Sequence, residues 1–149
     1  MSHAYTAHVV WSADAEAHRS GQYSRAHEWR FDGGASVRAS SAPPVPGSDP
    51  SGVDPEEALV AAVSSCHMLF FLAHARRHGL VVTAYDDQAE GRMSPNAEGK
   101  LYISRVTLRP LVTFDGPADP AVVTQVHDLA HSDCYLSHSI RGDVVVTPR

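Results

Sequence analysis

Residues 54–79 read DPEEALVAAVSSCHMLFFLAHARRHG, and this stretch predicts the longest helix of the chain. Asp54 can cap the free amides of a helix, and Pro55 fits the first helical position. The two glutamates that follow favour the positive end of the helix dipole. Basic residues fill the last turn, and Gly79 provides a left-handed stop. We therefore predict a helix that begins at Pro55 and ends at His78.

The predicted helix is apolar on nearly all its sides. Between Ala58 and Ala75 the apolar residues point in every direction around the axis, which is typical of a central helix covered on several faces. A membrane-spanning helix needs about 20 mostly apolar residues. This stretch is shorter and contains two serines, a cysteine and two histidines. We therefore predict a buried helix and no membrane contact.

The sequence before this helix predicts an antiparallel meander. Residues 23–31 alternate between an aromatic side and a polar side, which is the period-two pattern of a strand. A turn signal, Asp-Gly-Gly, follows, and prolines and glycines interrupt the segment before the helix. The expected strands are 4–12, 23–31 and 35–41, with loops at 13–22 and 42–53.

The sequence after the helix predicts a long hairpin, a second helix and a last strand. Residues 81–93 and 101–114 are rich in β-branched and aromatic types, and a turn cluster separates them. Asp119 and the proline after it repeat the helix start, and the valines at 144–146 form the last strand. This order predicts a single α+β domain over residues 1–149.

Length and charge narrow the classes of function. The 149 residues fit one domain, and a 43% hydrophobic content is enough for a core without a disulfide framework. The net charge is −5 and the longest run of Lys and Arg is two residues, so we expect no nucleic acid as a partner. Residues 1–5 lack the basic flank and apolar stretch of a secretory signal, which predicts a cytoplasmic location.

Two cysteines are candidates for redox chemistry. Cys66 falls in the middle of the long helix, and Cys134 falls just past the second helix. Each cysteine alone is typical of a small buried hydrophobe. A reactive thiolate needs a nearby cation, and Arg25 is a candidate because it lies on the aromatic face of the predicted strand 23–31. Its side chain could instead reach out to water.

Two segments resemble a known family. Residues 54–68, DPEEALVAAVSSCHM, and residues 130–137, AHSDCYLS, are similar to the OsmC/Ohr family of organic-hydroperoxide-reducing proteins. The resemblance implies an OsmC-like fold and a thiol peroxidase with a role in the oxidative stress response. It implies that Cys66 is the peroxide-reactive cysteine and Cys134 the resolving one, and that an arginine and a glutamate assist.

The resemblance also suggests which residues assist. Glu56 matches the family's glutamate after proline, ten positions before the first cysteine. The arginine is harder to place, since the N-terminal region varies within the family. The alternation along strand 23–31 selects Arg25 over Arg30 and Arg38. We expect Glu56 to orient Arg25 through a bidentate ion pair.

Sulfur chemistry gives the expected reaction. The Cys66 thiolate attacks the peroxide, an alcohol leaves, and the sulfenic acid condenses with Cys134 to a disulfide. A dithiol then reduces the pair. The reaction requires no metal or organic cofactor, and the resemblance suggests dihydrolipoyl groups on a partner protein as the reductant.

Helix geometry suggests a second chain at the site. Ten residues span about 15 Å of helix rise and leave Glu56 and Cys66 roughly 80° apart around the axis. They cannot share a site unless the helix breaks or another chain contributes. We therefore expect an intertwined homodimer with active sites at the interface.

The substrate pocket should be apolar, which favours alkyl or fatty-acid hydroperoxides. The expected wall residues of the pocket are Trp29, Met68, Phe70, Phe71 and Tyr135.

Three features depart from the common family pattern and indicate a side branch of the family. They are Asp54, His67 and the long loop before the helix.

Two other functions compete with the peroxidase. His127, His131 and Cys134 fall at i, i+4 and i+7 on one helix face, and His74 with His78 repeats the i, i+4 spacing, so a zinc site is possible. The second alternative is a non-catalytic module that binds a small apolar ligand, with both thiols merely buried.

Overall fold

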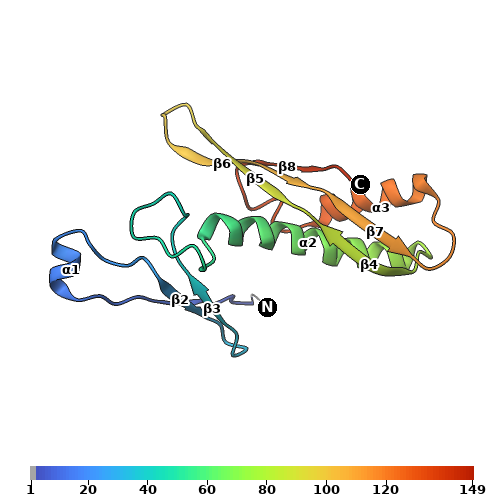
Figure 1. Ribbon diagram of the computed structural model, residues 1–149. Helices are drawn as coiled ribbons and strands as arrows, with labels where there is room; N and C mark the ends of the chain where they lie inside the picture. Colours follow the sequence, from blue (N-terminus) through green and yellow to red (C-terminus); the bar gives the residue numbers. More distant parts are fainter. Residues whose placement is uncertain (1–2) are drawn as a thin grey trace. The chain divides into compact units, whose positions relative to one another are not determined.

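The computed structural model describes residues 3–149 of the chain, which form two compact units (Figure 1). The first unit runs from Met1 to Ala58 and the second from Leu59 to Arg149. Each unit is described by itself. The element order is that of an α+β fold, as the sequence predicts.

The first unit contains the predicted meander. Its three strands form one antiparallel sheet in the order β1-β2-β3, and Trp29 of the central strand faces Val9 on one side and Val37 on the other. The strands are shorter than the sequence suggests. Their bounds are β1 His8–Val10, β2 His27–Arg30 and β3 Ser36–Ala39.

A short helix replaces the predicted loop at 13–22. This helix, α1, spans Ala15–Arg19, and the Asp14 carboxylate caps it by accepting hydrogen bonds from the amides of Glu16 and Ala17. Arg19 forms an ion pair with Glu16 one turn earlier. The loop prediction was wrong because five residues are too few to show a helical period, although the capping aspartate was visible.

The predicted strand 23–31 is correct only in its second half. The strand begins at His27, so Arg25 lies outside the regular pairing. The amide of Arg25 instead donates to the carbonyl of Gly47 at 2.8 Å, which ties it to the proline-rich loop. The alternation argument that selected Arg25 therefore does not hold.

The long helix confirms the sequence analysis closely. Helix α2 spans Pro55–Arg77 without a break. The amide of Glu57 donates to the Asp54 carboxylate at 2.8 Å, and the amide of Asp54 donates to the Glu57 carboxylate at 3.2 Å. This reciprocal pair is a capping box. Gly79 has φ of 74° just after the helix end, the left-handed stop that was expected.

The second unit contains the hairpin, which is broken into two halves. Strand β4 pairs with β7 and strand β5 pairs with β6, both antiparallel, while the last strand β8 joins β6 in parallel. The break falls at 88–89 and Arg109, where the Asp87 carboxylate accepts a hydrogen bond from the Arg109 amide at 2.6 Å. The bounds are β4 Val82–Asp87, β5 Glu90–Pro95, β6 Leu101–Leu108, β7 Pro110–Phe114, α3 Pro120–Asp133 and β8 Asp143–Val146.

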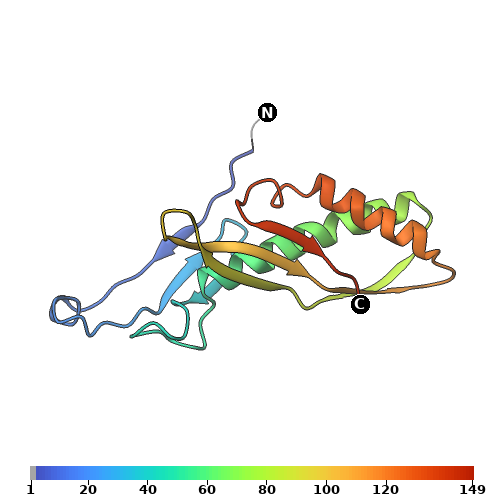
Figure 2. The ribbon, with the colours of Figure 1, turned by 90° about the horizontal axis from the view of Figure 1, so that it is seen from above.

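Both helices of the second unit contribute to its core. Phe71 of α2 and Val126 of α3 are fully buried and pack against β4 and β7. Val63, nearer the start of α2, packs against Val106 and Leu108 of β6. Figure 2 shows α3 running alongside the second half of α2. The interior thus brings residues of the two helices into contact.

Within the single chain, helix α2 is covered on one side and leaves another side exposed. One stripe of it is buried, but Leu69 on the opposite side is 60% exposed. The helix is long and apolar enough to pass a length and composition test for a membrane span, which the core helix of a soluble protein also passes. The exposed residues on this side form the open face of α2: Ala61, Ala62, Ser65, Leu69 and Ala73.

Candidate functional site

The two cysteines, 68 positions apart in sequence, lie against each other in the second unit. Cys66 is on α2 and half-buried, and Cys134 ends α3 and is only 1% exposed. The Cys66 side chain is near enough to affect the ionisation of Cys134, and both thiols are free. Burial, and then the contact with Cys66, raises the pKa of the Cys134 thiol. The arrangement offers one accessible sulfur and one protected sulfur.

The turn after α3 holds the Cys134 sulfur in place. The backbone of Leu136 and Ser137 lies close to this sulfur and partly opposes the rise in its pKa. The Ser137 hydroxyl donates to the carbonyl of Cys134 at 2.8 Å and contacts that of His131 at 3.1 Å. Amides directed at a sulfur stabilise its thiolate form. Burial outweighs this effect, so the pKa of the Cys134 thiol stays above its usual value.

A pair of buried histidines lies in the same interior. His67, next to Cys66, and His127 of α3 are 1% and 4% exposed. Their rings stack at 5.4 Å, with Nε2 of His67 at 3.1 Å from Nδ1 of His127. Burial lowers the pKa of each imidazole to about 4. Sequence reasoning noticed His67 only as a family departure and missed the pair, because its partner is 60 residues away.

The alternative of a zinc site has no geometric support. Within residues 3–149, no group of three or more His, Cys, Asp or Glu side chains is placed to hold a metal ion. His127 instead pairs with His67. His74 contacts the Asp133 carboxylate at 2.7 Å, and His78 contacts the His74 carbonyl at 2.8 Å. These contacts account for the i, i+4 histidines of α2.

In the first unit, ion pairs distinguish Arg30 and Arg38 from Arg25. Arg30 binds Glu28 at 2.8 Å, and this hydrogen bond is the main cause that lowers the pKa of Glu28 to about 2. Arg38 binds Asp49. Arg25 has no carboxylate partner within residues 3–149. Arg25 therefore remains the candidate because it lacks a carboxylate partner, and not because of its position in a strand.

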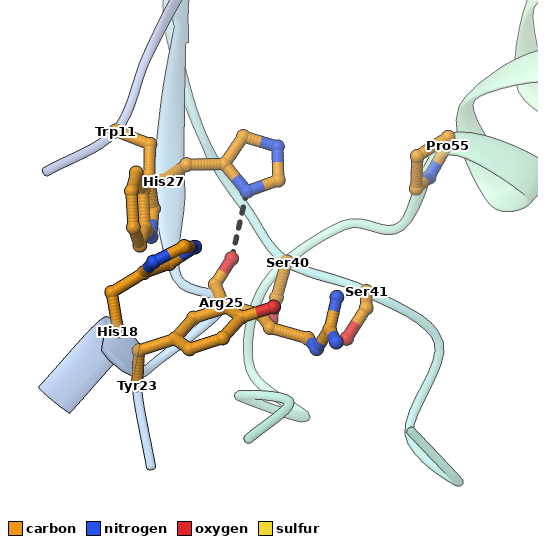
Figure 3. A pocket seen from close by; sticks show the side chains of 8 residues that line it. All are labelled: Trp11, His18, Tyr23, Arg25, His27, Ser40, Ser41 and Pro55. Carbon is orange, nitrogen blue, oxygen red and sulfur yellow. Dashed lines mark hydrogen bonds between the residues drawn. The ribbon is translucent and has the colours of Figure 1, made fainter. Parts of the chain in front are cut away.

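Arg25 lines a hollow of about 370 Å³ that belongs entirely to the first unit (Figure 3). Its Nε donates to the Pro46 carbonyl at 3.0 Å, and its guanidinium carbon lies 5.2 Å from the centre of the Tyr23 ring. Hydrogen-bonding and aromatic side chains share the lining with it. We call this hollow the aromatic pocket, and its lining includes Trp11, His18, Tyr23, Arg25, His27 and Ser41.

Glu56 does not pair with Arg25. It is half-buried in the first turn of α2 and forms no ion pair within the described part of the chain. The expected bidentate contact is therefore absent from this structure. Because α2 is continuous, Glu56 and Cys66 are separated by about 15 Å along one helix axis. The assisting role of Glu56 stays a prediction.

The predicted wall residues occupy different environments. Phe70 is half-buried, and its ring centre lies 5.1 Å from that of Tyr135 with the two rings perpendicular. Tyr135 follows Cys134 in the sequence. Met68 is half-buried on α2. Trp29 lies in the first unit, with its ring 6.0 Å from that of His27. Phe71 is fully buried in the core, so it cannot line an open pocket, contrary to the expectation.

Comparison with known proteins gives a consistent result. The family model described as OsmC-like protein matches residues 47–149. A solved OsmC-like protein of unknown function from Vibrio cholerae is 44% identical, with both chains covered in full and a TM-score of 0.93. The organic hydroperoxide resistance protein OhrB of Bacillus subtilis shares the fold at 19% identity, with 97% of each chain covered and a TM-score of 0.68.

A curated relative is also similar over part of its length. The uncharacterized protein YmaD of Bacillus subtilis is 28% identical over 96 residues. The alignment spans 62% of this chain and 63% of that protein. The similar proteins thus include one named for resistance to organic hydroperoxides and others without a described activity.

Proposed function

Because the chain belongs to the OsmC-like family, we propose that it is a thiol peroxidase that reduces organic hydroperoxides to alcohols. The observation that carries the proposal is the contact between Cys66 and Cys134, two thiols with unequal exposure. A peroxide needs an accessible sulfur, and a resolving thiol needs only to reach that sulfur. The half-buried Cys66 suits the first role and the buried Cys134 suits the second.

The oxidising half of the cycle forms one disulfide and releases one alcohol and one water molecule. The Cys66 thiolate attacks the distal peroxide oxygen, the O–O bond breaks, and the alkoxide takes a proton to leave as the alcohol. Cys66 is then a sulfenic acid. The Cys134 sulfur attacks the Cys66 sulfur, hydroxide leaves with the thiol proton as water, and the disulfide forms. The existing contact supports this step because little movement is needed.

The reducing half begins at the exposed sulfur. A thiolate of an external dithiol attacks Cys66, the S–S bond breaks, and Cys134 leaves as a thiolate that takes up a proton. The greater exposure of Cys66 supports this direction, because an external dithiol reaches it more easily than the buried Cys134. The second thiol of the reductant then displaces Cys66. A dihydrolipoyl group of a partner protein is the proposed dithiol.

Arg25 is the proposed cation of the site. A guanidinium without a carboxylate partner is free to hold Cys66 as a thiolate and to stabilise charge on the breaking O–O bond. Glu56 is the proposed residue that orients it. Transient catalytic disulfides are typical of the reducing cytoplasm, and the proposal places the protein there.

A homodimer is the proposed assembly. The open face of α2 is apolar and contains Leu69, whose side chain is 60% exposed in the single chain. Covering such a face with a second copy removes apolar surface from water. The 15 Å helix rise between Glu56 and Cys66, about three turns, also favours a site completed by another chain. Phe70, Met68, Tyr135 and Trp29 are the proposed apolar walls for an alkyl hydroperoxide.

Thiol titration tests the proposal. The reduced protein should lose two thiols on addition of one equivalent of cumene hydroperoxide and regain both with dihydrolipoamide. Hydrogen peroxide should react more slowly. Cys66→Ser should abolish turnover, whereas Cys134→Ser should accumulate a sulfenic acid that a dimedone probe labels on Cys66. Retention of both thiols after excess hydroperoxide would instead indicate a ligand-binding module.

A further inference from the structure

We propose that His74 and Asp133 are positioning residues that hold the resolving Cys134 within reach of Cys66. The inference rests on the proposed peroxidase function and deepens it, because it assigns the resolving step to a contact between two helices as well as to the two sulfurs. His74 lies on α2, and Asp133 is the last residue of α3, immediately before Cys134.

The His74–Asp133 pair ties the end of α3 to α2. Nε2 of His74 lies 2.7 Å from the Asp133 carboxylate, and because a carboxylate only accepts, the imidazole is the donor. Within residues 3–149, two hydrogen bonds between side chains join these helices. The other one, between His67 and His127, lies almost two turns before the end of α3. The His74–Asp133 pair is therefore the one that can control the position of Cys134.

The helical backbone ends at Cys134. This residue has φ of −64° and ψ of 110°, although its amide still donates to the Ala130 carbonyl at 3.0 Å. The last turn of a helix frays readily because its carbonyls lack partners within the helix. Asp133 is one peptide unit away, about 3.8 Å between Cα atoms. Fixing Asp133 therefore limits where the Cys134 sulfur can lie.

Both residues of the pair are unfavourable when taken alone. A carboxylate in the last turn of a helix opposes the helix dipole, so Asp133 destabilises α3 by itself. A buried imidazole costs free energy unless it has a partner, and the side chain of His74 is buried. The contact offsets both costs. This indicates that the two residues are present for their contact and not for the stability of either helix.

Neighbouring residues of α3 meet α2 at two separate points. Cys134 lies close to Cys66, whereas Asp133 contacts His74, eight positions farther along α2. Eight residues span about 12 Å of helix rise, so His74 acts through Asp133 and does not touch the reacting sulfurs. The Cys66 sulfur changes from thiol to sulfenic acid to disulfide during the proposed cycle, whereas the His74–Asp133 pair takes no part in the chemistry. The pair can thus hold the end of α3 while the sulfurs react, which speeds an intramolecular step.

Two rates separate positioning from a merely structural role. The reduced protein is mixed with one equivalent of cumene hydroperoxide, and hydroperoxide consumption and disulfide formation are followed separately by rapid quenching and intact mass spectrometry. Asp133→Ala should consume the hydroperoxide as fast as the wild type. It should form the disulfide about tenfold more slowly, the effect of losing one charge-assisted hydrogen bond. With dimedone present, a larger share of the Cys66 sulfenic acid should then be trapped.

The partner residue and a matched control sharpen the test. His74→Ala should slow disulfide formation as Asp133→Ala does, and the double variant should be no slower than either single variant, because the two residues act as one contact. His74→Gln keeps a donor and should restore a rate within about threefold of the wild type. Asp86→Asn breaks the ion pair of another carboxylate that is more than half exposed, with Arg149, and should form the disulfide as fast as the wild type.

Diamide distinguishes failure of this proposal from failure of the peroxidase function. The Cys66 thiolate adds to the N=N bond of diamide, the Cys134 sulfur attacks the Cys66 sulfur, and the S–N bond breaks to release the hydrazine, so no hydroperoxide is needed. A wild type that forms the disulfide with diamide but not with hydroperoxide would contradict the peroxidase. Slower disulfide formation with diamide in Asp133→Ala would still support positioning.

Three results would overturn the proposal. Equal rates of disulfide formation in the wild type and Asp133→Ala would show that the contact does not position Cys134. Equal slowing of hydroperoxide consumption and disulfide formation would indicate a structural role only. Absence of a disulfide in the wild type with both oxidants would mean that the sulfurs do not meet. If Asp133→Ala does not fold, Asp133→Asn keeps the shape without the charge and should be at least about threefold slower, and a wild-type rate in that variant would equally refute positioning.

Discussion

The buried histidine pair should make the protein sensitive to mild acid. His67 and His127 have pKa values of about 4 in the folded chain against 6.5 when exposed, so the unfolded chain binds more protons between these values. The contribution of this pair to the free energy of unfolding is therefore present above about pH 6.5 and is lost as the pH falls from 6.5 toward 4. At pH 5 the loss is about 2 kcal/mol for each imidazole. The sum, about 4 kcal/mol, is an upper limit because the two rings share one contact.

Urea unfolding of the reduced protein at pH 7.5, 6 and 5 measures this loss. The double variant His67→Leu/His127→Phe should show a much flatter dependence over the same range, even if it is less stable at pH 7.5. His8→Gln changes an exposed histidine on β1 and should keep the wild-type slope. The reasoning is refuted if the wild type and the double variant lose the same free energy of unfolding between pH 7.5 and 5.

Three further predictions concern the direction of disulfide reduction, the N-terminal cap of α2 and the open face of α2. When the oxidised protein meets a limiting monothiol, the mixed disulfide should map by mass spectrometry to Cys66, because Cys66 is the more exposed of the two cysteines; a mixed disulfide on Cys134 would reverse the assigned direction. Asp54→Ala should lower the free energy of unfolding by about 1 kcal/mol, measured with urea, because the capping box is lost. Leu69→Glu should give monomers in light scattering, whereas Leu111→Glu, at another exposed apolar position, should remain dimeric.

Local signals made most of the fold predictable. Helix α2 begins and ends where its capping residues indicate, since Asp54 and Gly79 act through contacts with their sequence neighbours. The same holds for α3, where Asp119 accepts from the amide of Ala121. The break in the long hairpin was not visible because Asp87 and Arg109 are 22 residues apart. What the chain encodes within a few residues could be predicted, and what it encodes by distant pairing could not.

The candidate site, too, could be predicted from the sequence only in part. The family resemblance selected Cys66 and Cys134, and the structure brings their side chains into contact. Arg25 was chosen from a strand pattern that the structure does not contain, and its distinction is the absence of a carboxylate partner, which no local pattern reveals. The pairing of His67 with His127 depends on how α2 and α3 pack together, so the sequence alone gave only two separate histidines.

The long sequence separation of the two cysteines has a consequence during synthesis. Cys66 leaves the ribosome 68 residues before Cys134, so at about 5–20 residues per second the nascent chain carries an unprotected thiol for roughly 3–14 s. Over that interval an oxidant could convert Cys66 to a sulfinic or sulfonic acid without any resolving thiol to intercept the sulfenic acid. Newly made chains are therefore the most vulnerable to irreversible damage when peroxide is abundant.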